Sequence, residues 1–198
     1  MTVETILPWI MSECGLDVFA PDISSNDYQM RQINALMNAA GKDINTRVEW
    51  ANATKALSIN AAVTSVSLPS DFQEVAGSGA ISHVGSYGMF RPVTDESMWQ
   101  FLSQNRPENP YYHIRSGMVY FTQPVADGGA EMIYISKNWL GTKSEISDNT
   151  DSPIFPEALL ARGTIWRWRR QKGLPYDDLM AEFEADLEAA VQADRGAP

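Results

Sequence analysis

The chain has 198 residues, of which 44% are hydrophobic, and 25 acidic against 15 basic residues give it a net charge of −10. This composition suits one folded domain with an ordinary apolar core and carries no signature of disorder. The acidic balance argues against binding to a nucleic-acid backbone as the main activity. The single cysteine, Cys14, excludes an internal disulfide framework.

The N-terminal segment MTVETILPWIM lacks the basic start and the long apolar run of a signal peptide. No stretch approaches the roughly 20 apolar residues of a membrane span. We therefore expect a soluble, unsecreted protein with no membrane partner.

Apolar periodicity predicts helices at both ends of the chain. The first segment carries a helical stripe that includes Pro8, and the range 27–50 has the pattern of a long amphipathic helix. Gly41 weakens the middle of that helix by roughly 1 kcal/mol. Pro156 and Gly173 delimit a helix over 156–172, and a last helix covers 176–193. The first stripe consists of Val3, Ile6, Leu7, Ile10 and Met11.

Between these helices the period changes to that of strands. ALSI at 56–59 and TSVSL at 64–68 predict strands, and TDESMWQFLSQ predicts a short helix capped by Thr94, with Met98, Phe101 and Leu102 on its apolar face. The segments YYHIR, MVYFT and EMIYIS, joined by short connections, predict a three-stranded antiparallel meander. The sequence therefore predicts a single α+β domain over 1–198. In it, a helical bundle from residues 1–52 and 154–195 carries a central antiparallel β insertion at 53–140.

We predict no catalytic, cofactor-binding or metal-binding site. His83 and His113 lie in expected strands without ligand spacing, and no local signature makes Cys14 a nucleophile. GSGAISHVG carries Ser82 where a dinucleotide loop needs its third glycine. GTKS has its Lys one place late for a phosphate loop and lacks the upstream glycine, and SDNTDS lacks the alternating acids and the glycine of a calcium loop.

The segment TIWRWRRQKG at 164–173 interleaves aromatic residues with cations, a pattern that is typical of grips on single-stranded nucleic acid. On a helix, Ile165 and Trp168 share one face, whereas Arg167 and Arg170 point away. We favour buried tryptophans and outward cations. A protein-docking face and a direct DNA contact are the alternatives. Under the favoured interpretation Arg167, Arg169, Arg170 and Lys172 pair with Asp177, Asp178 or Glu182 of the acidic last helix.

The order of segments in the C-terminal half resembles that of the head-to-tail adaptor (connector) proteins of tailed bacteriophages, including the tail-tubular adaptors of short-tailed phages. The pattern consists of EMIYISKNWL, the acidic turn DNTDSPIF and the segment EALLARGTIWRWRRQKGLPYDDLMAEFEADLEAA. A second similarity is the long helix ending near Trp50, followed by a strand, LPSDF and RPVTDESMWQFL. The resemblance covers residues 26–195.

This resemblance implies a structural virion protein that is made in the host cytoplasm and located in the neck between portal and tail. Such adaptors form a ring, dodecameric in the family, that docks under the portal, extends the DNA channel and offers an attachment surface to tail or nozzle proteins. DNA passes through without specific binding, which suits an acidic chain. Candidate subunit or portal contacts are then Arg167, Arg170 and Lys172, and candidate channel-lining acids are Glu182, Glu184, Asp186 and Glu188.

Two alternatives stay open from the sequence. Another neck or tail-completion protein belongs to the same structural class, and partner identity separates it from an adaptor. A nucleic-acid-binding accessory protein that uses 164–173 would show a salt-dependent affinity for DNA.

Overall fold

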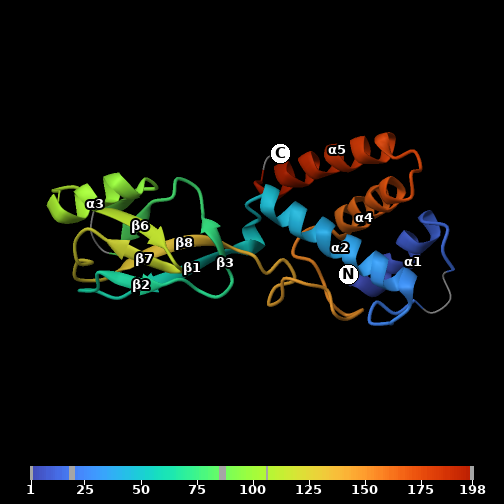
Figure 1. The fold of residues 1–198 in the computed structure, drawn as a ribbon, viewed down its shortest axis with the longest axis horizontal. Coiled ribbons are helices and arrows are strands. Elements are labelled where there is room, and N and C mark those ends of the chain that lie inside the picture. Colours follow the sequence, from blue (N-terminus) through green and yellow to red (C-terminus); the bar gives the residue numbers. More distant parts are fainter. Residues whose placement is uncertain (1, 18–20, 85–87, 106, 197–198) are drawn as a thin grey trace. The chain divides into compact units, whose positions relative to one another are not determined.

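The computed structural model describes residues 2–17, 21–84, 88–105 and 107–196, which form five α-helices and eight strands. The predicted α+β class is confirmed. The chain divides into two compact units, shown in Figure 1: a helical unit, Met1–Ala53 with Lys137–Pro198, and a sheet unit, Thr54–Ser136. How the two units combine into one adaptor domain stays a prediction.

The helical unit contains α1 (Val3–Glu13), α2 (Tyr28–Arg47), a short 3-10 turn (Ala51–Ala53), α4 (Glu157–Gln171) and α5 (Asp177–Asp194). Helix α4 contacts α1, α2 and α5, and in Figure 1 it lies between α2 and α5. The whole predicted stripe of α1 is buried, and Asp27 caps α2 through its carboxylate, which accepts hydrogen bonds from the backbone N–H groups of Gln29 and Met30. No helix among the described residues has the length and apolar character needed to cross a bilayer.

The connection from Lys137 to Phe155 has no helix or strand, yet it is tied to the helices by many hydrogen bonds. The backbone N–H of Val3 donates to the carbonyl of Asp151 at 2.8 Å, so this loop supplies an acceptor to the first turn of α1. Asn38 of α2 accepts from the N–H of Ile146 at 2.7 Å. The ring of Trp139 stacks on Phe155 with centroids 5.8 Å apart. The loop is therefore part of the helical core.

The sheet unit holds eight strands and α3 (Glu96–Asn105). The strands are β1 (Thr54–Ile59), β2 (Ser65–Ser67), β3 (Phe72–Val75), β4 (Ile81–His83), β5 (Met89–Pro92), β6 (Tyr111–Arg115), β7 (Met118–Phe121) and β8 (Ala130–Ser136). They follow the order β1-β8-β4-β5-β6-β7-β2, with β3 also paired to β8. The core of the unit includes Phe90 and Phe121, whose ring centroids lie 4.6 Å apart.

Two sequence predictions for the sheet are wrong. The β insertion is not wholly antiparallel, because β5 and β6 pair in parallel, with Arg91 opposite Tyr111. Helix α3 lies in the connection between these two strands, and a parallel pair needs such a crossover.

The predicted meander is also absent: β6 and β7 pair, but β8 pairs with β1, β3 and β4. After β7 the chain turns away from the hairpin, and Val125 exchanges backbone hydrogen bonds with Ala62 and Val63.

The predicted cap of α3 is also wrong. Asp95, and not Thr94, provides the side-chain acceptor at the start of α3, through a 2.7 Å bond from Met98 N–H.

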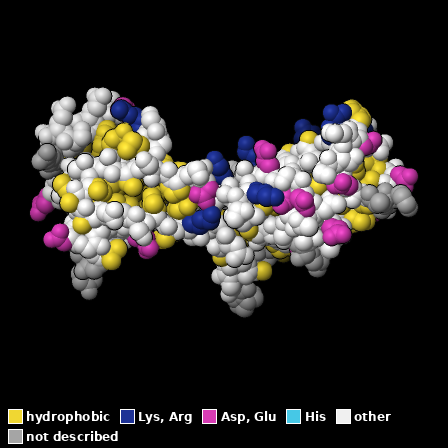
Figure 2. All heavy atoms as spheres, turned by 90° about the horizontal axis from the view of Figure 1, so that it is seen from below, with side chains coloured by type: hydrophobic (Ala, Val, Ile, Leu, Met, Phe, Trp, Pro, Cys, Tyr) yellow, Lys and Arg dark blue, Asp and Glu magenta, His cyan; other side chains and the backbone are white. Residues whose placement is uncertain are grey.

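Large hydrophobic side chains remain at the surface of both units. In the sheet unit they include Met98 and Phe101 of α3, which are 51% and 61% exposed, so the predicted apolar face of α3 is largely open to solvent. Figure 2 shows hydrophobic side chains gathered over the sheet unit, on the left of the view.

Candidate interaction surfaces

Helix α4, which carries the Trp/Arg segment, begins and ends where its sequence dictates. Pro156 precedes its first residue, and Glu157 places a carboxylate in the positive first turn. At its other end Gly173 adopts φ +70°, which glycine tolerates best. The N–H of Leu174 then bonds to the carbonyl of Arg169 at 2.9 Å, and that of Gly173 to Arg170 at 3.2 Å. This is a Schellman ending, and it turns the chain sharply into α5.

The tryptophans of α4 are buried, as predicted: Trp168 is 3% and Trp166 8% exposed. The ring of Trp166 lies 6.3 Å from those of Tyr176 and Phe183, between centroids. Their faces are thus occupied by the protein. Because single-strand grips rely on exposed aromatic faces, these two rings offer no stacking platform for bases.

The prediction that Arg167 points away from the helical unit is wrong. Its side chain is 15% exposed, and Nη2 lies 2.8 Å from Oδ2 of Asp43. Nη1 donates to the carbonyl of Gly163 at 2.8 Å, and the guanidinium lies 4.2 Å above the ring of Trp166. Burial lowers the pKa of Arg167 against the opposing effect of Asp43. Helix α2 packs against this side of α4. The sequence of α4 alone does not show this contact.

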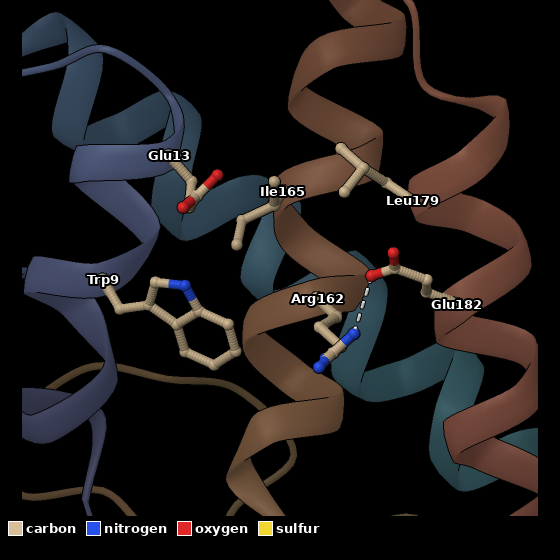
Figure 3. A pocket seen from close by; sticks show the side chains of 6 residues that line it. All are labelled: Trp9, Glu13, Arg162, Ile165, Leu179 and Glu182. Carbon is tan, nitrogen blue, oxygen red and sulfur yellow. Dashed lines mark hydrogen bonds and ion pairs between the residues drawn. The ribbon is translucent and has the colours of Figure 1, made fainter.

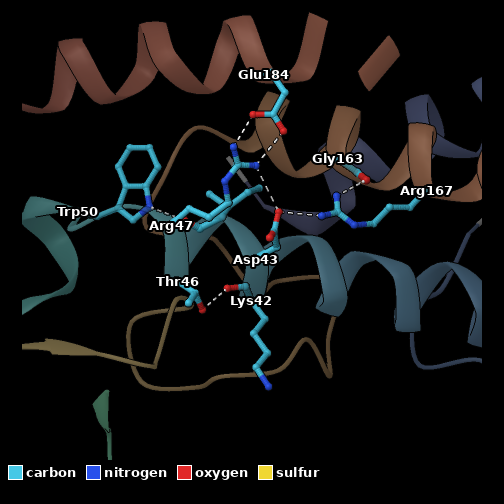
Figure 4. A network of polar contacts seen from close by, with 9 residues as sticks. Lys42, Asp43, Thr46, Arg47, Trp50, Gly163, Arg167 and Glu184 are labelled. Atoms are coloured by element: carbon cyan, nitrogen blue, oxygen red, sulfur yellow. Dashed lines mark hydrogen bonds and ion pairs between the residues drawn. The ribbon is translucent and has the colours of Figure 1, made fainter. Parts of the chain in front are cut away.

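Asp43 and Arg167 belong to a polar network that joins α2, α4 and α5 (Figure 4). Arg47 also pairs with Asp43, at 3.6 Å, and forms a bidentate pair with Glu184 of α5. The hydrogen bonds from Arg47 lower the pKa of Glu184. Charge-assisted contacts of this kind fix the relative register of the three helices.

The structure places the four α5 acids that were candidates for a channel lining in different settings. Glu184 pairs with Arg47, whereas Glu182 and Asp186 both pair with Arg162 of α4, each at 2.9 Å. Glu188 is exposed on α5. Three of the four acids thus stabilise the helical unit itself.

The pairing role of Arg162 was missed in the sequence analysis, which assigned the α4–α5 ion pairs to Arg167, Arg169, Arg170 and Lys172. A usable signal existed. Arg162 and Glu182 lie at equal distances from Lys172 in the sequence, and an antiparallel helical hairpin brings such residues opposite each other. Arg170 and Lys172 are exposed at the end of α4.

A groove opens between α1 and α5 with α4 as its floor (Figure 3). It encloses about 140 Å³ and is lined by Trp9, Glu13, Arg162, Ile165, Leu179 and Glu182. We call it the Trp9 groove. Trp9 is 38% exposed.

A second surface lies where the start of α2 meets the end of α4. A shallow hollow of about 410 Å³ is lined by Tyr28, Arg31, Gln32, Ala35, Leu36 and Gln171. Lys172 adjoins it, because its Nζ donates to Oε1 of Gln32 at 3.0 Å, while Nε2 of Gln32 donates to the hydroxyl of Tyr28 at 2.8 Å. Tyr28 is 64% exposed. We call this surface, with Lys172, the Tyr28 edge.

His113 and Cys14, which also carry reactive groups, are held within the packed structure. His113 is 6% exposed, its Nδ1 lies 2.7 Å from the carbonyl of Val93, and its ring stacks on Trp99. Burial raises the pKa of the Cys14 thiol to about 12. Among the described residues, no group of three His, Cys, Asp or Glu side chains is arranged to hold a metal ion.

A family model described as SU10 adaptor protein matches residues 5–197 of the chain. The match spans both units. A search of curated proteins finds no match.

Proposed function

The chain belongs to the SU10 adaptor protein family, a family of phage head-to-tail adaptors, and from this we propose that it forms a ring that docks beneath the portal. The ring would extend the DNA channel and provide the attachment surface for the tail, in the neck of the virion. The copy number we propose is that of a dodecamer. The observation that carries this proposal is the family match over residues 5–197.

The charge and surfaces of the chain support this role. A net charge of −10 repels phosphate, as a conduit through which DNA slides requires. Because Glu182, Glu184 and Asp186 are held in ion pairs within the helical unit, we propose exposed Glu188 as the lumen acid among the four. The role is structural and needs no catalytic group.

Contacts to a neighbouring subunit or to the portal are proposed for exposed Arg170 and Lys172. Arg167 is not a suitable probe of this contact, since its charge is neutralised by Asp43 inside the helical unit. Replacing Arg170 and Lys172 together by Glu should weaken assembly and leave the helical content of the monomer unchanged. Equal assembly by this variant and the wild type would contradict the assignment.

The deciding experiment is the mass of the complex, measured by light scattering for the chain alone and after mixing with the portal ring of its own phage. We expect a stable complex with one copy per portal subunit. A chain that stays monomeric in both samples would refute the proposal. Binding to a tail protein but not to the portal would identify a different neck component, and a salt-dependent affinity for DNA would support an accessory role.

A further inference from the structure

The Trp9 groove has the volume and the lining residues to accept one aromatic side chain. Its volume is about 140 Å³, and Trp9, Ile165 and Leu179 supply apolar surface. A cavity of roughly 150 Å³ lined by apolar groups holds a benzene ring. The groove is smaller than the roughly 300 Å³ at which small-molecule pockets begin. A protruding ring from a protein surface fits it better than a free ligand.

The rim of the groove is acidic. Arg162 faces both Glu182 and Asp186, and Glu13 adds a further carboxylate from α1. About two turns further along α4 from Arg162, Arg169 shares a second hollow with Asp177 and Asp178. This side of the helical unit therefore presents five carboxylates against two guanidinium groups. A partner that suits it carries positive charge beside its aromatic group.

The Tyr28 edge has these complementary properties. Among the residues that the structure describes, Tyr28 is the most exposed large hydrophobic side chain, at 64%. Arg31 lines the same hollow and Lys172 is bonded to its Gln32, so two cations flank the ring. The nearby carboxylate of Asp27 is engaged with backbone N–H groups at the start of α2.

The two surfaces lie on opposite sides of α4. Arg162 lines the groove and Gln171 lines the Tyr28 edge. They are nine positions apart in one helix, which is about two and a half turns and hence half a revolution around the axis. A contact between them cannot form within one molecule. A contact between two molecules would join two different surfaces. Repeating such a contact closes a ring if the rotation from one copy to the next permits it.

We propose that the Trp9 groove of one copy receives Tyr28 of a second copy, with Arg31 and Lys172 facing the acidic rim. This inference rests on the proposed ring, and it assigns the two faces of the helical unit that meet at each subunit contact. Tyr28 supplies the buried aromatic anchor, and the charges select the orientation.

Charge reversal tests the contact. Arg31→Glu and Glu13→Arg, each alone, should weaken assembly at low salt by at least about tenfold, because like charges then meet at the rim. The double variant should recover most of the lost assembly, because exchanging the two charges restores a pair of opposite charges. Lys42→Glu is the matched control, on an exposed position of the same helix outside the Tyr28 edge, and should assemble as the wild type does. Light scattering over a dilution series, with and without the portal ring, measures all four.

Cysteine cross-linking tests the same contact by geometry. Ser12→Cys beside the groove and Ala35→Cys on the Tyr28 edge keep all charges and can join only between copies. Under mild oxidation the double-cysteine chain should form a ladder of covalent oligomers, whereas the wild type, with only the partly buried Cys14, should not.

The outcomes separate the inference from the proposed function. If the wild type assembles, but the charge-reversal variants assemble equally well and the double-cysteine chain forms no ladder, the assigned faces are wrong and the adaptor proposal stands. If the wild type forms no assembly alone or with its portal, both are overturned.

Discussion

Because Gly41 has no side chain, the connection that follows the sheet unit packs closely on α2 at this position. In a helix interior, replacing glycine by alanine gains about 1 kcal/mol of helix stability. At this position, however, an added Cβ would lie 2.4 Å from two ring atoms of Trp139 and 2.7 Å from a third. No Cβ tolerates such distances, so the indole would have to move.

Trp139 has little freedom to move. It is 1% exposed, its Nε1 donates to the carbonyl of Ser144 at 2.7 Å, and its ring stacks on Phe155. Overpacking of a core costs typically 1–3 kcal/mol, and a rigid indole places this site at the upper end of about 3. After the helix gain is subtracted, Gly41→Ala should lower the free energy of unfolding by about 2 kcal/mol.

The assay is urea unfolding followed by tryptophan fluorescence, which reports mainly on the helical unit because five of the six tryptophans lie in it. Ala39→Gly, at an exposed position of the same helix, calibrates the propensity and should cost about 1 kcal/mol. In a Trp139→Phe background the smaller ring leaves room, so the cost of Gly41→Ala should shrink. A stabilisation of about 1 kcal/mol by Gly41→Ala in the wild type would refute the packing argument.

Three further predictions follow from the contacts. Arg167→Met should cost about 2 kcal/mol, because Asp43 loses its buried partner, whereas Arg170→Met should change the unfolding free energy by less than about 0.5 kcal/mol. Burial raises the pKa of Asp71, but the hydrogen bonds that its carboxylate accepts from Lys55 and two hydroxyls outweigh this effect. The pKa of Asp71 is therefore lowered. Its stabilising effect is therefore present above about pH 4 and lost as the pH falls through the lowered pKa, so an Asp71→Asn variant and the wild type should converge in stability on acidification. The Cys14 thiol, with a pKa of about 12, should resist alkylation at pH 8 in the native protein and react on unfolding; fast native alkylation would contradict its burial.

Local sequence signals were sufficient for the helices and for the end of α4, but not for the caps, which Asp27 and Asp95 provide. The stripe of α1 and the end of α4 at Gly173 depend on residues within a few positions of each other. The burial of Trp166 and Trp168 followed from the same periodicity, and the order of segments was enough to suggest the adaptor family.

Long-range pairing was decided only in three dimensions. The sequence could not show that β8 pairs with β1, β3 and β4, because that choice depends on strands far away in the chain. Nor could it show that Arg167 is withdrawn from the surface by its pairing with Asp43 of another helix. The sequence by itself therefore determined the helices, the buried stripe of α1 and the burial of Trp166 and Trp168 in α4, since these follow from local periodicity. Only the tertiary structure decided which charges are neutralised inside the helical unit and which remain at its surface, because that depends on which helices pack side by side.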